Sequence, residues 1–221
     1  MEELRKRIAG EEFDYQALLD GLREYERPRD KITTLLKKGV IIRVKKGIYI
    51  FGENDRRRPF SRELLANMIY GPSYISLETA LYHHGLIPER VEAMMSVSEG
   101  RGRRFFTPLG LFLYHRIPGK AYPIGIDQVA IEGERSFLMA TPEKALADKI
   151  QAERGLPLRS QTEMRVYLLE SLRIDRKALG SLDAEAVFLM AERYRSRKLR
   201  LLGGVIAKLT GQGEQVQDGY E

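Results

Sequence analysis

The chain contains no cysteine among its 221 residues. Disulfide bonds and thiolate metal sites are therefore excluded, and we expect the protein in a reducing compartment such as the cytoplasm. Histidine is almost as scarce, with only His83, His84 and His115 present. A zinc site would need carboxylate ligands to complete it, so we expect neither a metal ion nor any other cofactor.

Long apolar runs are also missing. No stretch approaches the length of a membrane span, and the N-terminal residues MEELRKRIAG lack the apolar core of a signal peptide. Hydrophobic residues make up 43% of the chain and charged residues 31%, a balance typical of a soluble globular protein. We therefore expect no association with a membrane. The length allows one large domain or two small ones.

The excess of positive charge lies in one short segment. The whole chain has a formal net charge of +6, but residues 23–58 alone hold twelve Lys and Arg against five Asp and Glu, an excess of +7. The rest of the chain therefore sums to −1. Positive charge confined in this way is typical of a module that binds a polyanion such as DNA.

The same segment has the pattern of a winged helix-turn-helix. Asp14 is a good N-cap for a second short helix, and Pro28 suits the first turn of a third. Two β-branched runs joined by a turn that contains Gly47 then favour a hairpin. Three helices followed by a basic hairpin are the winged helix order. The expected elements are helices over 2–9, from Asp14 and over 28–38, and strands over 40–44 and 48–51.

Beyond a polar linker at 53–60, the pattern predicts a second domain of helices and strands. Turns with Gly or Pro separate its strand-like runs, and Ser160 to Glu163 form a capping box ahead of a C-terminal helical part. The predicted helices start at Ser61, Ser76, Thr141, Ser160, Asp183 and Arg197, and the predicted strands cover 93–97, 104–107, 110–117, 125–131 and 136–139.

We therefore predict an α+β fold with two domains. An N-terminal winged helix-turn-helix over residues 1–52 is followed by the linker and by a mixed α/β domain over 61–210, whose last part is helical. A flexible tail is expected over 211–221, where the sequence is small and polar.

In a winged helix, the third helix enters the major groove and reads base edges with its N-terminal half. The second half of that helix and the wing are placed to contact DNA phosphates, and these contacts release counterions from the DNA. The alternative is that these cations only keep a small helical domain in solution. The predicted DNA-binding residues are Arg29, Lys31, Thr33, Thr34, Lys37, Lys38, Arg43, Lys45 and Lys46.

Three other basic runs are open to two interpretations. Residues 56–58 are a solvated linker or an extension that touches phosphates. The run from Arg193 to Arg200 is a solvated helix face or a second binding surface. Arg101, Arg103 and Arg104 precede Phe105 and Phe106, which favours a hairpin turn with buried aromatic rings over a nucleic-acid-binding loop.

Catalytic signals are weak. Glu143-Lys144 and Asp148-Lys149 are similar to the acid–lysine pairs of metal-dependent nucleases, but those pairs sit on a strand and these fall in a helical pattern. His83 and His84 fall at a helix end, where histidine interacts well with the C-terminal dipole. We therefore predict that the protein is not an enzyme, and we assign no catalytic residue.

The chain resembles the AbiEi family of antitoxins, which belong to type IV toxin–antitoxin systems and act in abortive infection. The resemblance extends from about Phe13 to Ile150, and three stretches carry it. The first, Leu35 to Tyr49 (LLKKGVIIRVKKGIY), is alone only a generic wing. The others are more specific in their order and spacing: YISLETAL from Tyr74 with GLIPE from Gly85, and ATPEKALADK from Ala140.

This resemblance implies a regulator whose winged helix represses its own operon by binding promoter repeats. It also implies that the protein opposes a nucleotidyltransferase-like toxin, without necessarily binding that toxin directly. A winged-helix regulator whose second domain senses a ligand or partner is the first alternative, and a nuclease guided by the winged helix is the second.

Overall fold

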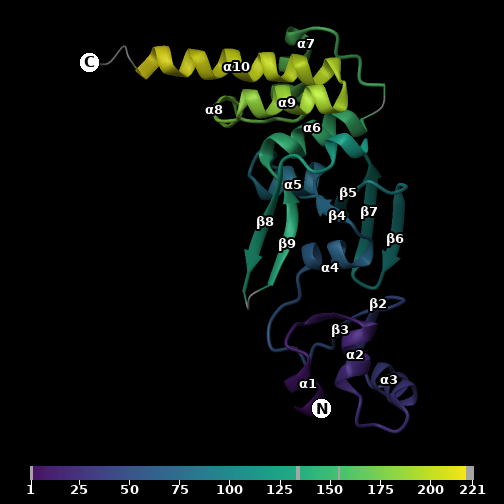
Figure 1. The fold of residues 1–221 in the computed structure, drawn as a ribbon. Helices are drawn as coiled ribbons and strands as arrows, with labels where there is room; N and C mark the ends of the chain where they lie inside the picture. The colour runs from purple at the N-terminus through teal and green to yellow at the C-terminus, as the bar shows by residue number, and fades with distance from the viewer. Residues whose placement is uncertain (1, 133–134, 154, 218–221) are drawn as a thin grey trace.

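The computed structural model describes residues 2–132, 135–153 and 155–217, and it confirms the α+β class. The molecule is elongated (Figure 1). A small N-terminal unit lies at one end, a six-stranded sheet occupies the middle, and a layer of helices with the long last helix lies at the other end.

The N-terminal unit is made of three helices and a three-stranded antiparallel sheet in the order β1-β3-β2. The short strand β1 was not predicted from the sequence; it pairs Glu12 with Ile50 and Phe13 with Tyr49 on β3. A core that includes Leu18, Leu22 and Phe51 holds the unit together. Its elements are α1 (Glu2–Arg7), β1 (Glu12–Asp14), α2 (Tyr15–Gly21), α3 (Pro28–Lys37), β2 (Ile41–Lys45) and β3 (Ile48–Phe51).

The central sheet has the order β6-β7-β5-β4-β9-β8, and only the pairs β4/β9 and β5/β7 are parallel. Helix α4 packs on one face, where the Tyr114 hydroxyl donates to the carbonyl oxygen of Ala66. The elements are α4 (Arg62–Ile69), β4 (Ser73–Ile75), α5 (Leu77–His83), β5 (Met94–Ser98), β6 (Arg103–Thr107), β7 (Gly110–Arg116), the 3-10 turn η1 (Gly119–Ala121), β8 (Ile126–Ile131) and β9 (Arg135–Ala140).

The C-terminal helices pack on one another beyond the sheet, and α10 contacts α7, α8 and α9. They are α6 (Pro142–Ala152), α7 (Gln161–Val166), a π-helical turn η2 (Tyr167–Ser171), α8 (Arg176–Gly180), α9 (Ala184–Tyr194) and α10 (Arg197–Gln217). Helix α10 continues past residue 211 to Gln217, into the segment that the sequence predicts as a tail. Residues 218–221 of that tail lie outside the described residues. Within the described residues, no helix combines the length and apolar character that crossing a bilayer requires.

Polar and apolar contacts join the N-terminal unit to the sheet domain. The buried carboxylate of Glu12 accepts two hydrogen bonds from Nη1 of Arg135, at 2.9 and 2.8 Å, and another from the backbone N–H of Ser61. Val44 and Ile50 of the small sheet also belong to the large hydrophobic cluster that runs through the central sheet. The small sheet is therefore packed against the sheet domain.

Candidate nucleic-acid interface

Helix α3 forms where the sequence predicted a helix. Pro28 occupies its first turn, and Ile32 and Leu35 are buried against the core of the N-terminal unit. Gly39 follows the helix with a φ of 69°, a left-handed conformation that glycine adopts without a steric penalty. The buried stripe fixes which way the helix faces, so the opposite side points to solvent.

The outer face of α3 carries the residues predicted to read DNA. Arg29, Thr33 and Lys37 follow one another at four-residue spacing, and all are exposed. Thr34 and Lys38 form a second exposed row beside them. The Thr33 and Thr34 hydroxyls donate to backbone oxygens four residues earlier, at 3.2 and 3.0 Å. Their lone pairs remain free to accept a hydrogen bond from a base.

Lys31 lies apart from these rows. Its ammonium nitrogen is 4.5 Å from the ring centre of Tyr25, in the loop before α3, and its side chain is half-buried. The ammonium group of Lys31 is therefore already engaged in a cation–π contact within the protein. Lys31 therefore belongs to the loop side of the helix rather than to the face formed by Arg29 and Thr33.

Lys45 does not join the exposed cations of the wing. Its Nζ donates a 2.7 Å hydrogen bond to the carbonyl oxygen of Ile69 and lies 4.3 Å from the ring centre of Phe105. The register of β2 and β3 shifts between Arg43 and Lys45, so Val44 is an extra residue in the ladder. Lys45 was predicted to contact DNA together with Arg43 and Lys46, but the bulge turns it toward the sheet domain.

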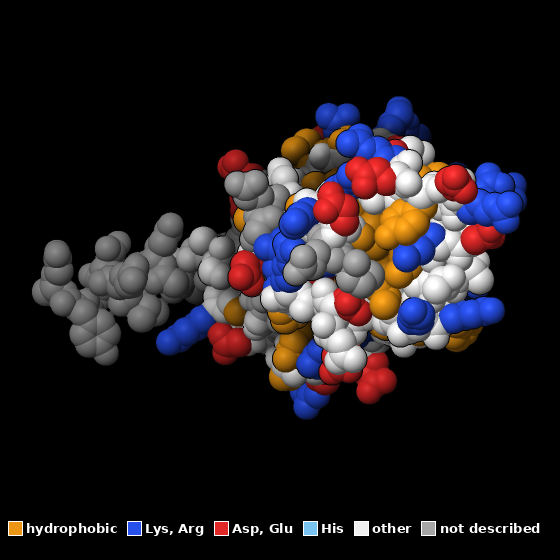
Figure 2. Space-filling model, turned by 90° about the horizontal axis from the view of Figure 1, so that it is seen from below, with side chains coloured by type: hydrophobic (Ala, Val, Ile, Leu, Met, Phe, Trp, Pro, Cys, Tyr) orange, Lys and Arg blue, Asp and Glu red, His pale blue; other side chains and the backbone are white. Residues whose placement is uncertain are grey.

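Arg43 and Lys46 remain on the outer surface of the wing, where both are exposed. Figure 2 views the molecule from the end that carries α3. Lys and Arg side chains stand mainly around the edge of this face, with Asp and Glu side chains and an apolar patch between them. Seven predicted residues share this exposed character: Arg29, Thr33, Thr34, Lys37, Lys38, Arg43 and Lys46.

The arginine run at 56–58 folds back on the N-terminal unit. Arg58 donates to the carbonyl oxygen of Ala9 at 3.1 Å, and the guanidinium of Arg56 lies 5.1 Å from the ring centre of Phe60. The backbone N–H of Arg57 donates to Glu11. These contacts give the run a structural role at the junction of the two units.

The other two basic runs lie elsewhere on the molecule. The run from Arg193 to Arg200 spans the end of α9 and the start of α10, at the opposite end from α3 (Figure 1). At the edge strand β6, Phe105 packs against Tyr70 and Tyr114, but Phe106 is 83% exposed. The prediction that both aromatic rings are buried is wrong for Phe106, since neighbouring residues of a strand point to opposite faces.

One member of each acid–lysine pair is built into the interior, whereas Glu143 and Lys149 are partly exposed. Lys144 and Asp148 are fully buried on α6, with Nζ and Oδ1 3.4 Å apart. Asp148 accepts hydrogen bonds from the hydroxyls of Tyr74, Ser76 and Tyr194. Burial lowers the pKa of Lys144, and the charge of Asp148 opposes that shift. The network ties α6 to β4 and α9, and none of the described pockets includes Asp148 or Lys144.

The three histidines differ in their hydrogen bonding and exposure. His84 Nε2 lies 2.8 Å from the carbonyl oxygen of Ala140, whereas His83 is exposed and lines a cavity. Burial lowers the pKa of His115, with Glu78, Lys149 and Asp148 as the nearby charges. The rings of His83 and His84 are in edge-to-face contact, with their centres 5.4 Å apart.

No protein-family model matches the chain, and no curated protein matches it.

Proposed function

We propose that residues 2–52 form a winged helix-turn-helix that binds double-stranded DNA, and that the protein is a transcriptional regulator without enzymatic activity. The observation that carries this proposal is the outer face of α3. It presents Arg29, Thr33 and Lys37 to solvent at the end of the molecule farthest from α10.

The order of elements supports the proposal. Helices α1 to α3, with β1 between the first two, precede the hairpin of β2 and β3, which is the winged helix arrangement. In that arrangement α3 enters the major groove, and the hairpin lies over the neighbouring backbone. Lys37, Lys38, Arg43 and Lys46 are then the phosphate contacts, while Arg29 and Thr33 face base edges.

Burial of Lys144 and Asp148 speaks against the nuclease alternative. A metal-dependent nuclease needs its carboxylates in contact with metal, water and a phosphodiester. Here the hydroxyls of Tyr74, Ser76 and Tyr194 already occupy the Asp148 carboxylate in the protein interior.

We further propose that the regulator is the antitoxin of a type IV system, in keeping with the AbiEi-like stretches. The partner is then a nucleotidyltransferase-like toxin encoded beside it. Co-expression of the chain with that toxin should restore growth. Growth arrest that the full chain leaves unchanged would remove the antitoxin role and leave the DNA-binding role standing.

A footprint on the DNA upstream of its own gene tests the regulator role. The full chain should protect repeated sites, and a Lys37→Ala, Lys38→Ala, Lys46→Ala variant should lose that protection. A control with three exposed lysines changed elsewhere, Lys120→Ala, Lys177→Ala and Lys208→Ala, has the same net charge and should protect normally. Equal loss in both variants would show that total charge, not this face, governs binding.

A further inference from the structure

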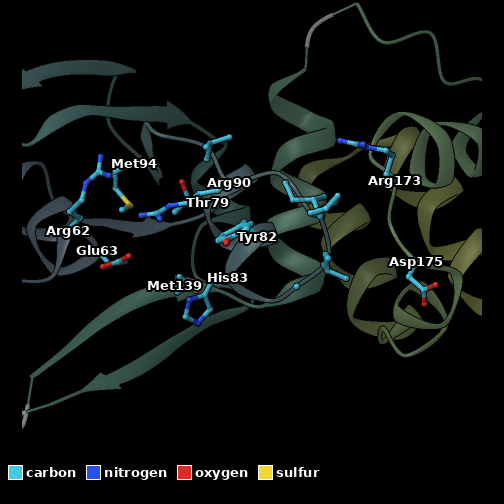
Figure 3. Close-up of a pocket in the computed structure, with 15 residues that line it drawn as sticks. Arg62, Glu63, Thr79, Tyr82, His83, Arg90, Met94, Met139, Arg173 and Asp175 are labelled. Carbon is cyan, nitrogen blue, oxygen red and sulfur yellow. The ribbon is translucent and has the colours of Figure 1, made fainter.

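A cavity of about 700 Å³ opens between the central sheet and the C-terminal helices. Its walls come from α4, α5, the loop after α5, the start of β5 and the segment before α8 (Figure 3). This volume falls within the range of roughly 300–1,000 Å³ that small-molecule sites occupy. Ordinary cofactor- or nucleotide-sized ligands therefore fit it.

Two arginines on one side of the cavity have unused hydrogen-bond donors. Arg62 and Arg90 line this cavity and also an adjoining one, so they stand where the two meet. Arg62 gives one hydrogen bond, from Nη2 to the carbonyl oxygen of Glu92 at 2.8 Å, and its Nε is buried without a partner. Arg90 is exposed and has no hydrogen-bond or ion-pair partner among the described residues. Guanidinium groups with free donors favour an anion.

The acidic residues of the cavity accept hydrogen bonds from neutral groups of the protein. Glu63 accepts a hydrogen bond from the Ser61 hydroxyl at 2.8 Å. Asp175 caps α8 by accepting from the backbone N–H groups of Lys177 and Ala178. Arg173, on the far side from Arg62 in Figure 3, forms an ion pair with Glu89. The guanidinium donors that remain free in the cavity are therefore those of Arg62 and Arg90, while Glu63 and Asp175 keep their negative charges.

The remaining wall is apolar and contains one exposed aromatic ring. Tyr82 on α5 is 43% exposed and lines the cavity, as does its neighbour His83 (Figure 3). Buried Leu86, Ile87 and Met94 line the cavity as well. An exposed ring beside apolar side chains provides a surface on which a planar base stacks.

We propose that this cavity binds a nucleotide, with its phosphate groups on Arg62 and Arg90 and its base against Tyr82. A phosphate satisfies the free donors of both guanidinium groups, and a base covers the exposed ring and the apolar wall. This inference goes beyond the proposed DNA-binding function, because the cavity lies in the sheet domain and is made by other residues.

Titration calorimetry of the full chain with ATP, GTP and AMP, in the absence of DNA, tests the proposal. At least one of them should bind. Arg90→Ala and Tyr82→Ala should each weaken that binding by about tenfold or more, since each removes one of the two kinds of contact. Both side chains are exposed, so neither change disturbs the core.

The matched controls are Arg165→Ala, an exposed arginine on α7, and Tyr25→Ala, whose ring is 42% exposed. Both should leave the affinity within twofold. Absence of binding by all three nucleotides would overturn the proposal, as would affinity unchanged in Arg90→Ala and Tyr82→Ala. The proposal would also be overturned if tripolyphosphate or adenosine bound as tightly as ATP. Either the base or the phosphate groups would then contribute nothing to the affinity.

Discussion

The side-chain nitrogen of Lys45 on the wing donates a hydrogen bond to the carbonyl oxygen of Ile69, the last residue of α4. Lys46, the next residue, is exposed. Two adjacent lysines of one basic hairpin therefore have different roles: one joins the wing to the sheet domain, and the other is available for a phosphate.

Lys46→Ala should weaken DNA binding across sequences and reduce the salt dependence of log K by about one, as the loss of a single phosphate contact does. Lys45→Ala should change the salt slope less and lower the free energy of unfolding by about 1–2 kcal/mol, since it removes a charge-assisted hydrogen bond. Gel-shift titrations over a salt series and urea denaturation measure the two effects. Equal salt slopes for both variants would contradict the distinction.

Arg135→Ala should lower the free energy of unfolding by about 3–5 kcal/mol, because it leaves the buried carboxylate of Glu12 without its cation. The side chain of Glu12 is fully buried, and that of Arg135 is 12% exposed. Arg104→Ala, which removes an exposed arginine from β6, is the control and should be nearly neutral. Denaturant unfolding followed by circular dichroism gives both values, and a loss below about 1 kcal/mol for Arg135→Ala would disprove the expectation.

Gly52→Ala should destabilise the N-terminal unit by about 3 kcal/mol through overpacking. A Cβ at Gly52 would lie 1.9 Å from the carbonyl oxygen of Gly39, which is a backbone group and cannot turn away as a flexible side chain could. Gly211→Ala on α10 meets nothing within 4 Å and should be neutral or slightly stabilising. Thermal unfolding of the two variants compares them directly; similar melting temperatures would count against the contact.

Stability should fall steeply in alkaline solution. Burial, reinforced by the charge of Asp148, raises the pKa of Tyr74 and of Tyr194 far above the ordinary value of 10.0. The unfolded chain then releases protons above about pH 10 while the folded chain keeps them, so each tyrosine lowers the free energy of unfolding by about 1.4 kcal/mol per pH unit. Lys144, whose pKa is lowered by burial, acts in the opposite direction, but only up to its ordinary pKa of 10.5.

Denaturant unfolding at several pH values above about 10 measures this slope. Tyr194→Phe should make it shallower by about 1.4 kcal/mol per pH unit, even though the variant is less stable to begin with. If Tyr74 and Tyr194 gain phenolate absorbance near the ordinary pKa of 10.0 while the protein is still folded, the expectation is wrong.

Local signals predicted much of the fold. Thr141 followed by Pro142 and the capping box at Ser160 mark helix starts through contacts within one turn, and both helices begin there. Strand β1 was missed because three residues give no alternating pattern; it exists through its pairing with β3. The position of Lys45 could not be predicted either, since it depends on a bulge and on a carbonyl 24 residues away. The exposed rows of α3, in contrast, follow from the spacing of Ile32 and Leu35 alone.

Helix α4 spans eight residues, a rod of about 12 Å. Arg62 at its start lines the cavity, and Ile69 at its end holds the lysine of the wing. A ligand that binds in the cavity more tightly at one tilt of α4 than at another therefore also favours one position of the β2–β3 hairpin. By thermodynamic linkage the effect is reciprocal. DNA that binds preferentially to one position of the hairpin changes the affinity of the cavity for that ligand by the same factor.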